Sequence, residues 1–240
     1  MVVKSQPRRA RRRPIAWVFW TLVRIVFGFA LVTLLWVVAY RFIDPPTTWP
    51  MLRDAVQGRH VERTWVPLAD ISPAMPRAAI GAEDANFCVH NGFDFGAIEA
   101  AMERNASSKK LRGGSTISQQ TAKNAFLWPE RSWLRKGLET YFTVLIEAVW
   151  GKPRIMEVYL NIAEMGRGIY GVEAAGQHYF NTPASRLTPL QAARLAAILP
   201  QPIKRDAAAP GKYTKRYAGR IQKRIGVVRR EGVDGCLGRA

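Results

Sequence analysis

The stretch Arg112-Gly-Gly-Ser-Thr-Ile-Ser-Gln-Gln-Thr-Ala-Lys-Asn124 joins a glycine turn to the start of a polar helix. Adjacent glycines let the backbone turn tightly and let a ligand approach it closely. Ser115 and Thr116 are typical helix N-cap residues, and Gln119 stands where a capping box after Thr116 needs its partner. The free N–H groups of the first helical turn, with Lys123 one turn beyond Gln119, predict a site for an anion. An ordinary capped helix with a solvated lysine is the structural alternative.

Length and charge restrict the class of protein. The 240 residues can build one sizeable core, and their formal net charge is +18. This charge predicts an acidic partner, which could be nucleic acid, anionic lipid or a phosphorylated substrate. The two cysteines, Cys88 and Cys236, and the scattered histidines show no metal-ligand pattern, so no metal site is predicted. The cysteines could pair outside the cytosol, although their spacing does not require it.

A membrane-spanning helix is predicted near the N-terminus. Arginines at residues 8–13 stand directly before an apolar run from Ile15 to Tyr40. As a helix this run would be about 39 Å long, enough to cross a hydrocarbon core of about 30 Å. Arg24 interrupts the run and could snorkel to the headgroups. The positive-inside rule places residues 1–14 in the cytoplasm and the chain after Arg41 outside it, which explains the arginines better than a nucleic-acid-binding arm.

The rest of the chain has mainly helical patterns, without sustained strand alternation or internal repeats. After an extended linker, the start and stop signals predict helices from Ile71 onward, over 95–105 (with Ile98, Ala101 and Met102 inward), 133–150, 153–164, 172–180, and from Pro189 to Pro200. The basic tail after Pro202 places Ile221, Ile225 and Val228 on one helical face. This face could pack on the core or on an anionic membrane surface.

Three acidic residues are candidates for chemistry. Glu83 and Asp84 follow the first helical stretch, although the dipole at a helix C-terminus favours cations. A carboxylate in a partly apolar cleft near Phe87 could have its pKa raised enough to act as a base. His90 is more readily a packed or capping residue than a catalytic one. Glu139 could share a helical face with two cations at 135 and 136, which alone indicates only a surface ion-pair set.

These stretches occur in one order and resemble the successive motifs of the peptidoglycan glycosyltransferases of family 51. The likeness covers roughly residues 65–205 and is greatest to the monofunctional members, since a transpeptidase domain has no room here. The motif residues are Glu83, Asp84, Phe87, His90 and Gly92; Gly113 and Gly114 through Gln120, with Lys123 and Asn124; Arg135, Lys136 and Glu139; residues 155–161; and residues 171–180.

The resemblance implies a mainly α, lysozyme-like domain of two lobes behind one N-terminal transmembrane helix. It implies that lipid II is polymerised into β-1,4 glycan strands, with inversion and release of undecaprenyl diphosphate. Glu83 would be the general base that deprotonates the acceptor 4-hydroxyl. Glu139 would be the second catalytic acid, assisting at the diphosphate or orienting its cationic neighbours. The expected substrate and diphosphate ligands are Ser115, Thr116, Gln119, Gln120, Lys123, Asn124, Arg131, Arg135 and Lys136. No cofactor is required, and a divalent cation, Mg or Mn, assisting the diphosphate is left open.

The same resemblance and the topology predict an inner-membrane protein with its catalytic domain in the periplasm. Expected partners are the growing lipid-linked glycan, the anionic lipid surface and proteins of cell division or elongation, with no nucleic acid. The predicted regions are a cytoplasmic tail (1–14), the transmembrane helix (15–40), a membrane-proximal linker (41–64), the glycosyltransferase domain (65–205) and a basic helical tail (206–240).

Two other functions fit parts of the pattern. A membrane-anchored muramidase would use two acids to cleave glycan, because a poor alkoxide leaving group needs a proton donor. The cations around these acids favour a diphosphate leaving group instead, because fixed positive charge stabilises the departing anion. In a non-enzymatic cell-wall or lipid-binding module the acids would form only ion pairs.

Overall fold

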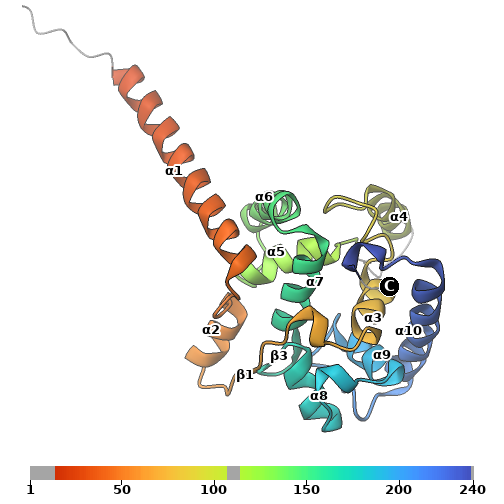
Figure 1. The fold of residues 1–240 in the computed structure, drawn as a ribbon. Helices are drawn as coiled ribbons and strands as arrows, with labels where there is room; N and C mark the ends of the chain where they lie inside the picture. The colour runs from red at the N-terminus through yellow and green to blue at the C-terminus, as the bar shows by residue number, and fades with distance from the viewer. Residues whose placement is uncertain (1–13, 107–113, 239–240) are drawn as a thin grey trace, which may run out of the picture.

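A computed structural model describes residues 14–106 and 114–238 and confirms a mainly α protein (Figure 1). The predicted tail before residue 14 and Gly113 lie outside the described residues. The helices are α1 (Pro14–Phe42), α2 (Trp49–Val56), α3 (Ala74–Glu83), α4 (Phe95–Ala106), α5 (Ile117–Phe126), α6 (Trp133–Val149), α7 (Gly151–Ile162), α8 (Val172–Phe180), α9 (Pro189–Ile198) and α10 (Lys212–Glu231). Short 3-10 turns cover Leu68–Asp70, Ala184–Arg186 and Gly235–Leu237.

Two details of the helix prediction are wrong. Helix α7 begins at Gly151 and ends at Ile162, because Glu164 enters a β-strand instead of continuing the helix. Met102 does not point inward: its side chain is 67% exposed, and Ala101 is the one residue of α4 with a described side chain that is buried. Helix α4 lies at the edge of the molecule, which leaves most of its surface in solvent (Figure 1).

A small three-stranded sheet was not predicted. Its order is β1 (Glu62–Arg63), β3 (Ile169–Tyr170) and β2 (Glu164–Gly166), with β1 parallel and β2 antiparallel to β3. Strands this short cannot show an alternating pattern in the sequence. Between β2 and β3, Gly168 has a φ of +75°, and a side chain there would meet the carbonyl oxygen of His60 at 2.2 Å. The sheet ties the segment that follows α2 to the connection between α7 and α8.

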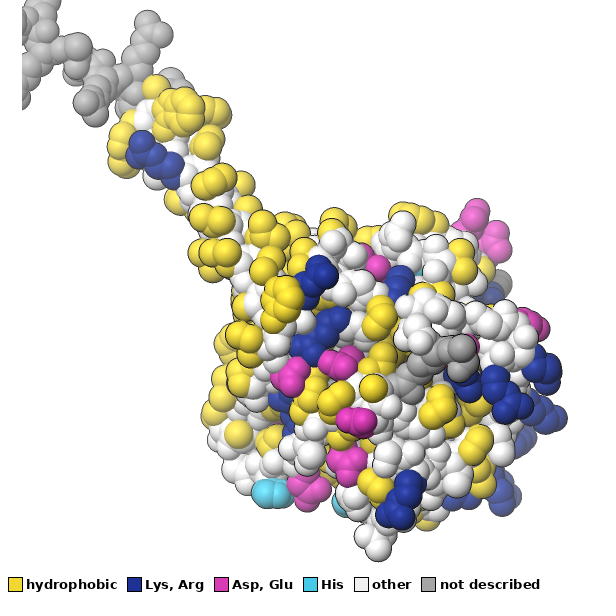
Figure 2. Space-filling view, viewed as in Figure 1, with side chains coloured by type: hydrophobic (Ala, Val, Ile, Leu, Met, Phe, Trp, Pro, Cys, Tyr) yellow, Lys and Arg dark blue, Asp and Glu magenta, His cyan; other side chains and the backbone are white. Residues whose placement is uncertain are grey.

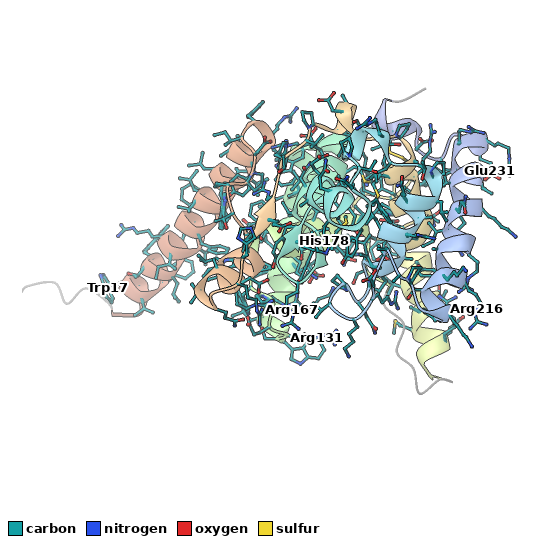
Figure 3. All side chains as sticks on the ribbon, turned by 90° about the horizontal axis from the view of Figure 1, so that it is seen from below. Trp17, Arg131, Arg167, His178, Arg216 and Glu231 are labelled. Carbon is teal, nitrogen blue, oxygen red and sulfur yellow. A yellow bond between two sulfur atoms is a disulfide. The ribbon has the colours of Figure 1, made fainter. Side chains whose placement is uncertain are left out.

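The helices pack in two groups. Helices α3, α9 and α10 pack together, while α5 packs against both α6 and α7. Helix α10 packs on α3 and α9, and its residues Ile221, Ile225 and Val228 are buried. The predicted apolar face therefore covers the core and does not face a membrane. The outer face of α10 is basic and lies on the side of the molecule opposite α1 (Figures 2 and 3).

Helix α1 is long and apolar enough to cross a membrane: an 18-residue window between Ala16 and Phe42 has a mean hydropathy of 2.4. Hydrophobic side chains cover its outer part in Figure 2. Its last third packs on the domain: Thr33 lies 2.7 Å from the Tyr141 hydroxyl, and the Trp150 indole donates a 2.7 Å hydrogen bond to the Val37 carbonyl. The helix therefore combines the properties of a membrane anchor with a packed junction.

A disulfide joins Cys88 to Cys236, whose Cα atoms are 5.4 Å apart. Cys88 lies in the turn after α3 and Cys236 in the 3-10 turn after α10. The bond, which the sequence left undecided, fastens the end of the chain to the segment that follows Glu83.

Candidate active site

Glu83 is the last residue of α3, and α5 supplies its nearest partner. The amide of Gln120 donates a 3.0 Å hydrogen bond to one Glu83 carboxylate oxygen. Burial raises the pKa of Glu83 above its ordinary value, and the Gln120 hydrogen bond, Arg205 and Lys123 offset only part of that rise. Burial makes this carboxylate a better proton acceptor than an exposed glutamate, while the nearby cations help to stabilise its charged form.

Asp84, the next residue, is buried and organises the loop that follows. Its carboxylate accepts a hydrogen bond from His90 Nε2 at 2.9 Å and from the backbone N–H of Ile117 at 2.9 Å. His90 Nδ1 in turn accepts the N–H of Gly92 at 3.1 Å, so the Nε2 proton points at Asp84. His90 is a bridging residue here, in agreement with the interpretation that it packs or caps.

The N-terminus of α5 is not an open anion site, which corrects the prediction from the opening motif. Thr116 is the N-cap and forms a capping box with Gln119, while Asp84 occupies the first N–H group of the helix. The protein thus supplies its own anion to this helix end, where the dipole favours it. Gln119 is buried in this cap, and Ser115 is exposed beside it.

Two of the motif glycines, Gly92 and Gly114, fit closely against neighbouring helices. Gly92 has a φ of +90°, and a side chain there would meet Thr143 Cγ2 at 2.8 Å. Its carbonyl accepts the Thr116 hydroxyl at 2.7 Å, which links the Asp84 loop to α5. A side chain on Gly114 would meet the backbone of α4 at 3.3 Å from Ile98 Cα. Phe87 is fully buried and lies 4.6 Å from the Lys152 ammonium.

A second acid, Glu139, lies among cations on α6. Arg135 donates to one of its carboxylate oxygens at 2.6 Å and Lys136 to the other at 2.5 Å. Glu139 is only 3% exposed and Arg135 is buried with it, whereas the Lys136 side chain is 44% exposed, so the set reaches from the interior to the surface. Arg131 is exposed just before the helix and is labelled in Figure 3.

Lys123 interacts electrostatically with both acids, Glu83 and Glu139. Burial lowers the pKa of Lys123, Glu139 opposes this change, and Arg135, Lys136 and Arg131 add to it. Lys123 also acts on Glu83, so one cation is within range of both carboxylates. Lys123 and its neighbour Asn124 line a cavity of about 110 Å³.

Several residues of the site were not predicted as such. Arg205 acts on Glu83 from the segment after α9, and Tyr217 and Arg224 donate to the carbonyls of Ala82 and Gly81 from α10. The sequence showed them only as part of a basic tail, and no local signal could have placed them beside α3. The hydroxyl of Tyr159 is buried near Glu83 and Asp84, without a hydrogen-bond partner among the described residues.

Within residues 14–106 and 114–238, no group of three or more His, Cys, Asp or Glu side chains could hold a metal ion. The candidate site is instead a raised-pKa glutamate beside a group of lysines and arginines. Such a site can accept a proton and stabilise a developing anion at the same time.

A sequence model of the family described as "Transglycosylase" matches residues 51–226. The chain belongs to this transglycosylase family. The matched segment contains the Glu83 site, the Glu139 set and most of α10, and extends on both sides beyond 65–205.

Named relatives of this transglycosylase family agree over nearly the whole chain. The biosynthetic peptidoglycan transglycosylase of Caulobacter vibrioides is 58% identical over 201 residues, which is 84% of this chain and 88% of that protein. The protein of that name from Rhodospirillum centenum is 46% identical over 217 residues, covering 90% and 94% of the two chains. The one from Jannaschia sp. is 45% identical over 234 residues, covering 98% and 96%.

Proposed function

We propose that this chain is a peptidoglycan glycosyltransferase that polymerises lipid II into β-1,4-linked glycan strands. The observation that carries the proposal is Glu83, a partly buried carboxylate with a raised pKa near Arg205 and Lys123, and Lys123 is in turn near the cations of α6. Membership of the transglycosylase family and the names of the relatives support the substrate class.

Glu83 is the general base in this reaction. As the 4-hydroxyl of the acceptor sugar attacks the anomeric carbon of the donor, its proton passes to the Glu83 carboxylate. The new glycosidic bond forms while the bond from that carbon to the diphosphate breaks, and undecaprenyl diphosphate leaves with the electron pair. A single attack from the opposite face inverts the configuration, from the α-linked donor to the β product.

The cations stabilise the departing diphosphate. Lys123 and Arg131 are its proposed direct ligands, with Ser115, Gln120 and Asn124 beside them in the cleft. Glu139 accepts hydrogen bonds from two cations, which suits a carboxylate that orients Arg135 and Lys136 better than one that donates a proton. We propose that these side chains need no cofactor and that Mg or Mn, if bound, would add to them.

The muramidase alternative has less support. A glycan hydrolase needs a carboxylic acid to protonate the leaving sugar oxygen, as well as a second carboxylate. Glu83, with its raised pKa, suits the first role, but the Glu139 carboxylate is already engaged on both oxygens and does not suit the second. A diphosphate leaves as a stabilised anion and needs the cations that are present.

We also propose that α1 spans the inner membrane with its N-terminus in the cytoplasm and the catalytic domain in the periplasm. The Cys88–Cys236 disulfide supports this orientation, because disulfides persist in the periplasm and are rare in the cytosol. Proteins of cell division or elongation are proposed partners.

The test is a gel assay of the full-length protein in detergent with labelled lipid II, beside Glu83→Gln. The wild type should produce a ladder of glycan chains that lysozyme digests, and the variant should polymerise about 10²- to 10⁴-fold more slowly. Release of fragments from preformed glycan, without a ladder, would instead identify a muramidase. Binding of lipid II with neither reaction would identify a binding module.

A further inference from the structure

The cavity beside Lys123 reaches from the end of α5 to helix α2. Its walls are α2, the end of α5 with the turn that follows it, and the strands β2 and β3. The volume of about 110 Å³ is room for a group the size of a few water molecules. Helix α2 belongs to the segment that the sequence indicated only as a linker.

Arg53 of α2 lines this cavity with an unused donor. Its Nε atom is buried and has no hydrogen-bond partner in the described part of the chain. The nearest charged group is the Asp54 carboxylate, 3.7 Å away, which is beyond hydrogen-bonding distance and is already engaged by Arg59 at 2.7 Å and Tyr170 at 2.9 Å. A buried donor without an acceptor costs free energy, so an acceptor that enters the cavity would be stabilised there.

Lys123 contributes the second cation of the same cavity. Its ammonium makes no hydrogen bond or salt bridge with any residue of 14–106 or 114–238, although burial disfavours its charged form. Two cations that line one enclosed space repel each other until an anion lies between them. The Asn124 side chain adds a neutral polar group.

Glu164 is the one acidic side chain that lines the cavity. Burial raises its pKa, Asp54 adds to the rise, and Arg53, Arg59 and Arg167 offset part of it. Glu164 is thus protonated more readily than an exposed glutamate, and the protonated group donates a hydrogen bond and does not repel an anion.

We propose that this cavity binds a phosphate group of the lipid diphosphate, with Arg53 as a further ligand of the leaving group. The inference rests on the proposed function and extends the diphosphate site from α5 to α2. Exposed apolar side chains on α2, Trp49, Leu52 and Val56, are 49%, 45% and 80% exposed beside the end of the membrane helix. A phosphate held here could therefore remain attached to a lipid whose chain stays in the bilayer.

The experiment compares Arg53→Ala with Arg59→Ala in the full-length protein. Both arginine side chains are 35% exposed and both approach Asp54, but only Arg53 lines the cavity. Binding of radiolabelled undecaprenyl diphosphate is measured in phosphatidylcholine nanodiscs, and kcat and KM are measured with lipid II. The Tm of each variant, compared with that of the wild type, shows whether a loss of binding or activity comes from loss of stability.

We expect Arg53→Ala to weaken undecaprenyl diphosphate binding and lower kcat/KM by about 10- to 100-fold, as loss of a charged hydrogen bond does. Arg59→Ala should change the binding of undecaprenyl diphosphate and kcat/KM by less than about twofold. Arg53→Lys should have an effect between those of Arg53→Ala and Arg59→Ala. Equal effects of the two alanine variants, or no effect of Arg53→Ala, would overturn the proposal.

A second arm identifies the source of the phosphate. Nanodiscs that contain phosphatidylglycerol should not displace undecaprenyl diphosphate; displacement that disappears in Arg53→Ala would instead assign the cavity to a phospholipid headgroup. The proposed function fails separately, if the wild type binds undecaprenyl diphosphate through Arg53 but makes no glycan. The inference alone fails if the wild type polymerises lipid II and Arg53→Ala does so equally well.

Discussion

Glu83 can take a proton only while it is ionised, and its environment sets the pH at which that happens. Because burial raises its pKa, the acidic limb of the pH profile of kcat/KM should lie above the ordinary glutamate value of about 4.3. The Gln120 hydrogen bond stabilises the charged form and so lowers this pKa. Gln120→Ala should therefore move the limb to higher pH, and steady-state kinetics across pH would show it. A limb that stays in place or moves to lower pH would contradict the assigned base.

The sequence was sufficient to select most residues of the site, but it did not predict which of them are in contact. Glu83, Gln120, Lys123 and Glu139 were all selected, and the structure brings Gln120 and Lys123 into range of Glu83. The role of Asp84 was not predictable, because its partner Ile117 comes 33 residues later and only the folded chain aligns them. For the same reason an anion site was expected at a helix end that Asp84 already fills.

At the scale of elements, α10 holds the end of α3 in place. Arg224 donates to the Gly81 carbonyl at 2.7 Å, and the Tyr217 hydroxyl to the Ala82 carbonyl at 3.1 Å. These carbonyls belong to the two residues before Glu83, at a helix end where a cation is favourable. The basic tail is thus a support of the proposed base.

Arg224→Ala and Tyr217→Phe should lower kcat by several-fold while KM for lipid II changes little, because Glu83 would be less well positioned. Arg224→Ala should also lower the free energy of unfolding by about 1–3 kcal/mol. Lys223→Ala, at the neighbouring exposed position, is the matched control and should behave as the wild type. A change in KM alone would show that these residues contact substrate instead.

Local signals determined how well each element was predicted. The capping boxes Thr116–Gln119 and Thr188–Gln191 start α5 and α9 where the sequence indicated, because a cap involves only nearby residues. The β-strands have only two or three residues, and β1 pairs with β3 from about 100 residues away, as in Glu62 with Ile169. Glu164 pairs with the nearby Tyr170, but its strand has three residues and is too short for a periodic signal, which is why Glu164 was placed in a helix.

Across the whole molecule, the Cys88–Cys236 disulfide closes a loop of 148 residues in sequence. Loss of such a bond costs about 2–5 kcal/mol, because the unfolded chain regains conformational freedom. Cys88→Ser and Cys236→Ser should each lower the Tm of the purified protein, and the double variant should match the single ones since all three lose the same bond. Additive losses in the double variant would show that each thiol position contributes by packing and not by the bond.

The membrane helix contributes to the domain as well as to its location, and the two contributions lie in different parts of α1. Thr33 and Val37 are buried against the domain, whereas the preceding turns are mostly exposed. Removal of residues 1–42 would expose Trp150 and leave its indole N–H without the Val37 carbonyl. It would also remove the Tyr40 carbonyl that accepts from Arg154 at 2.9 Å.

A chain that starts at residue 33 should therefore keep nearly the Tm of the full-length protein in the same detergent, although it loses most of the apolar helix. A chain that starts at residue 43 should unfold at a lower temperature, because the Trp150–Val37 hydrogen bond, worth about 0.5–1.5 kcal/mol, and the Trp36–Phe126 contact are both lost. Equal Tm values for the two truncations would mean that α1 only anchors the domain. The expected difference would show that the catalytic domain is complete only with the last turns of its own membrane helix.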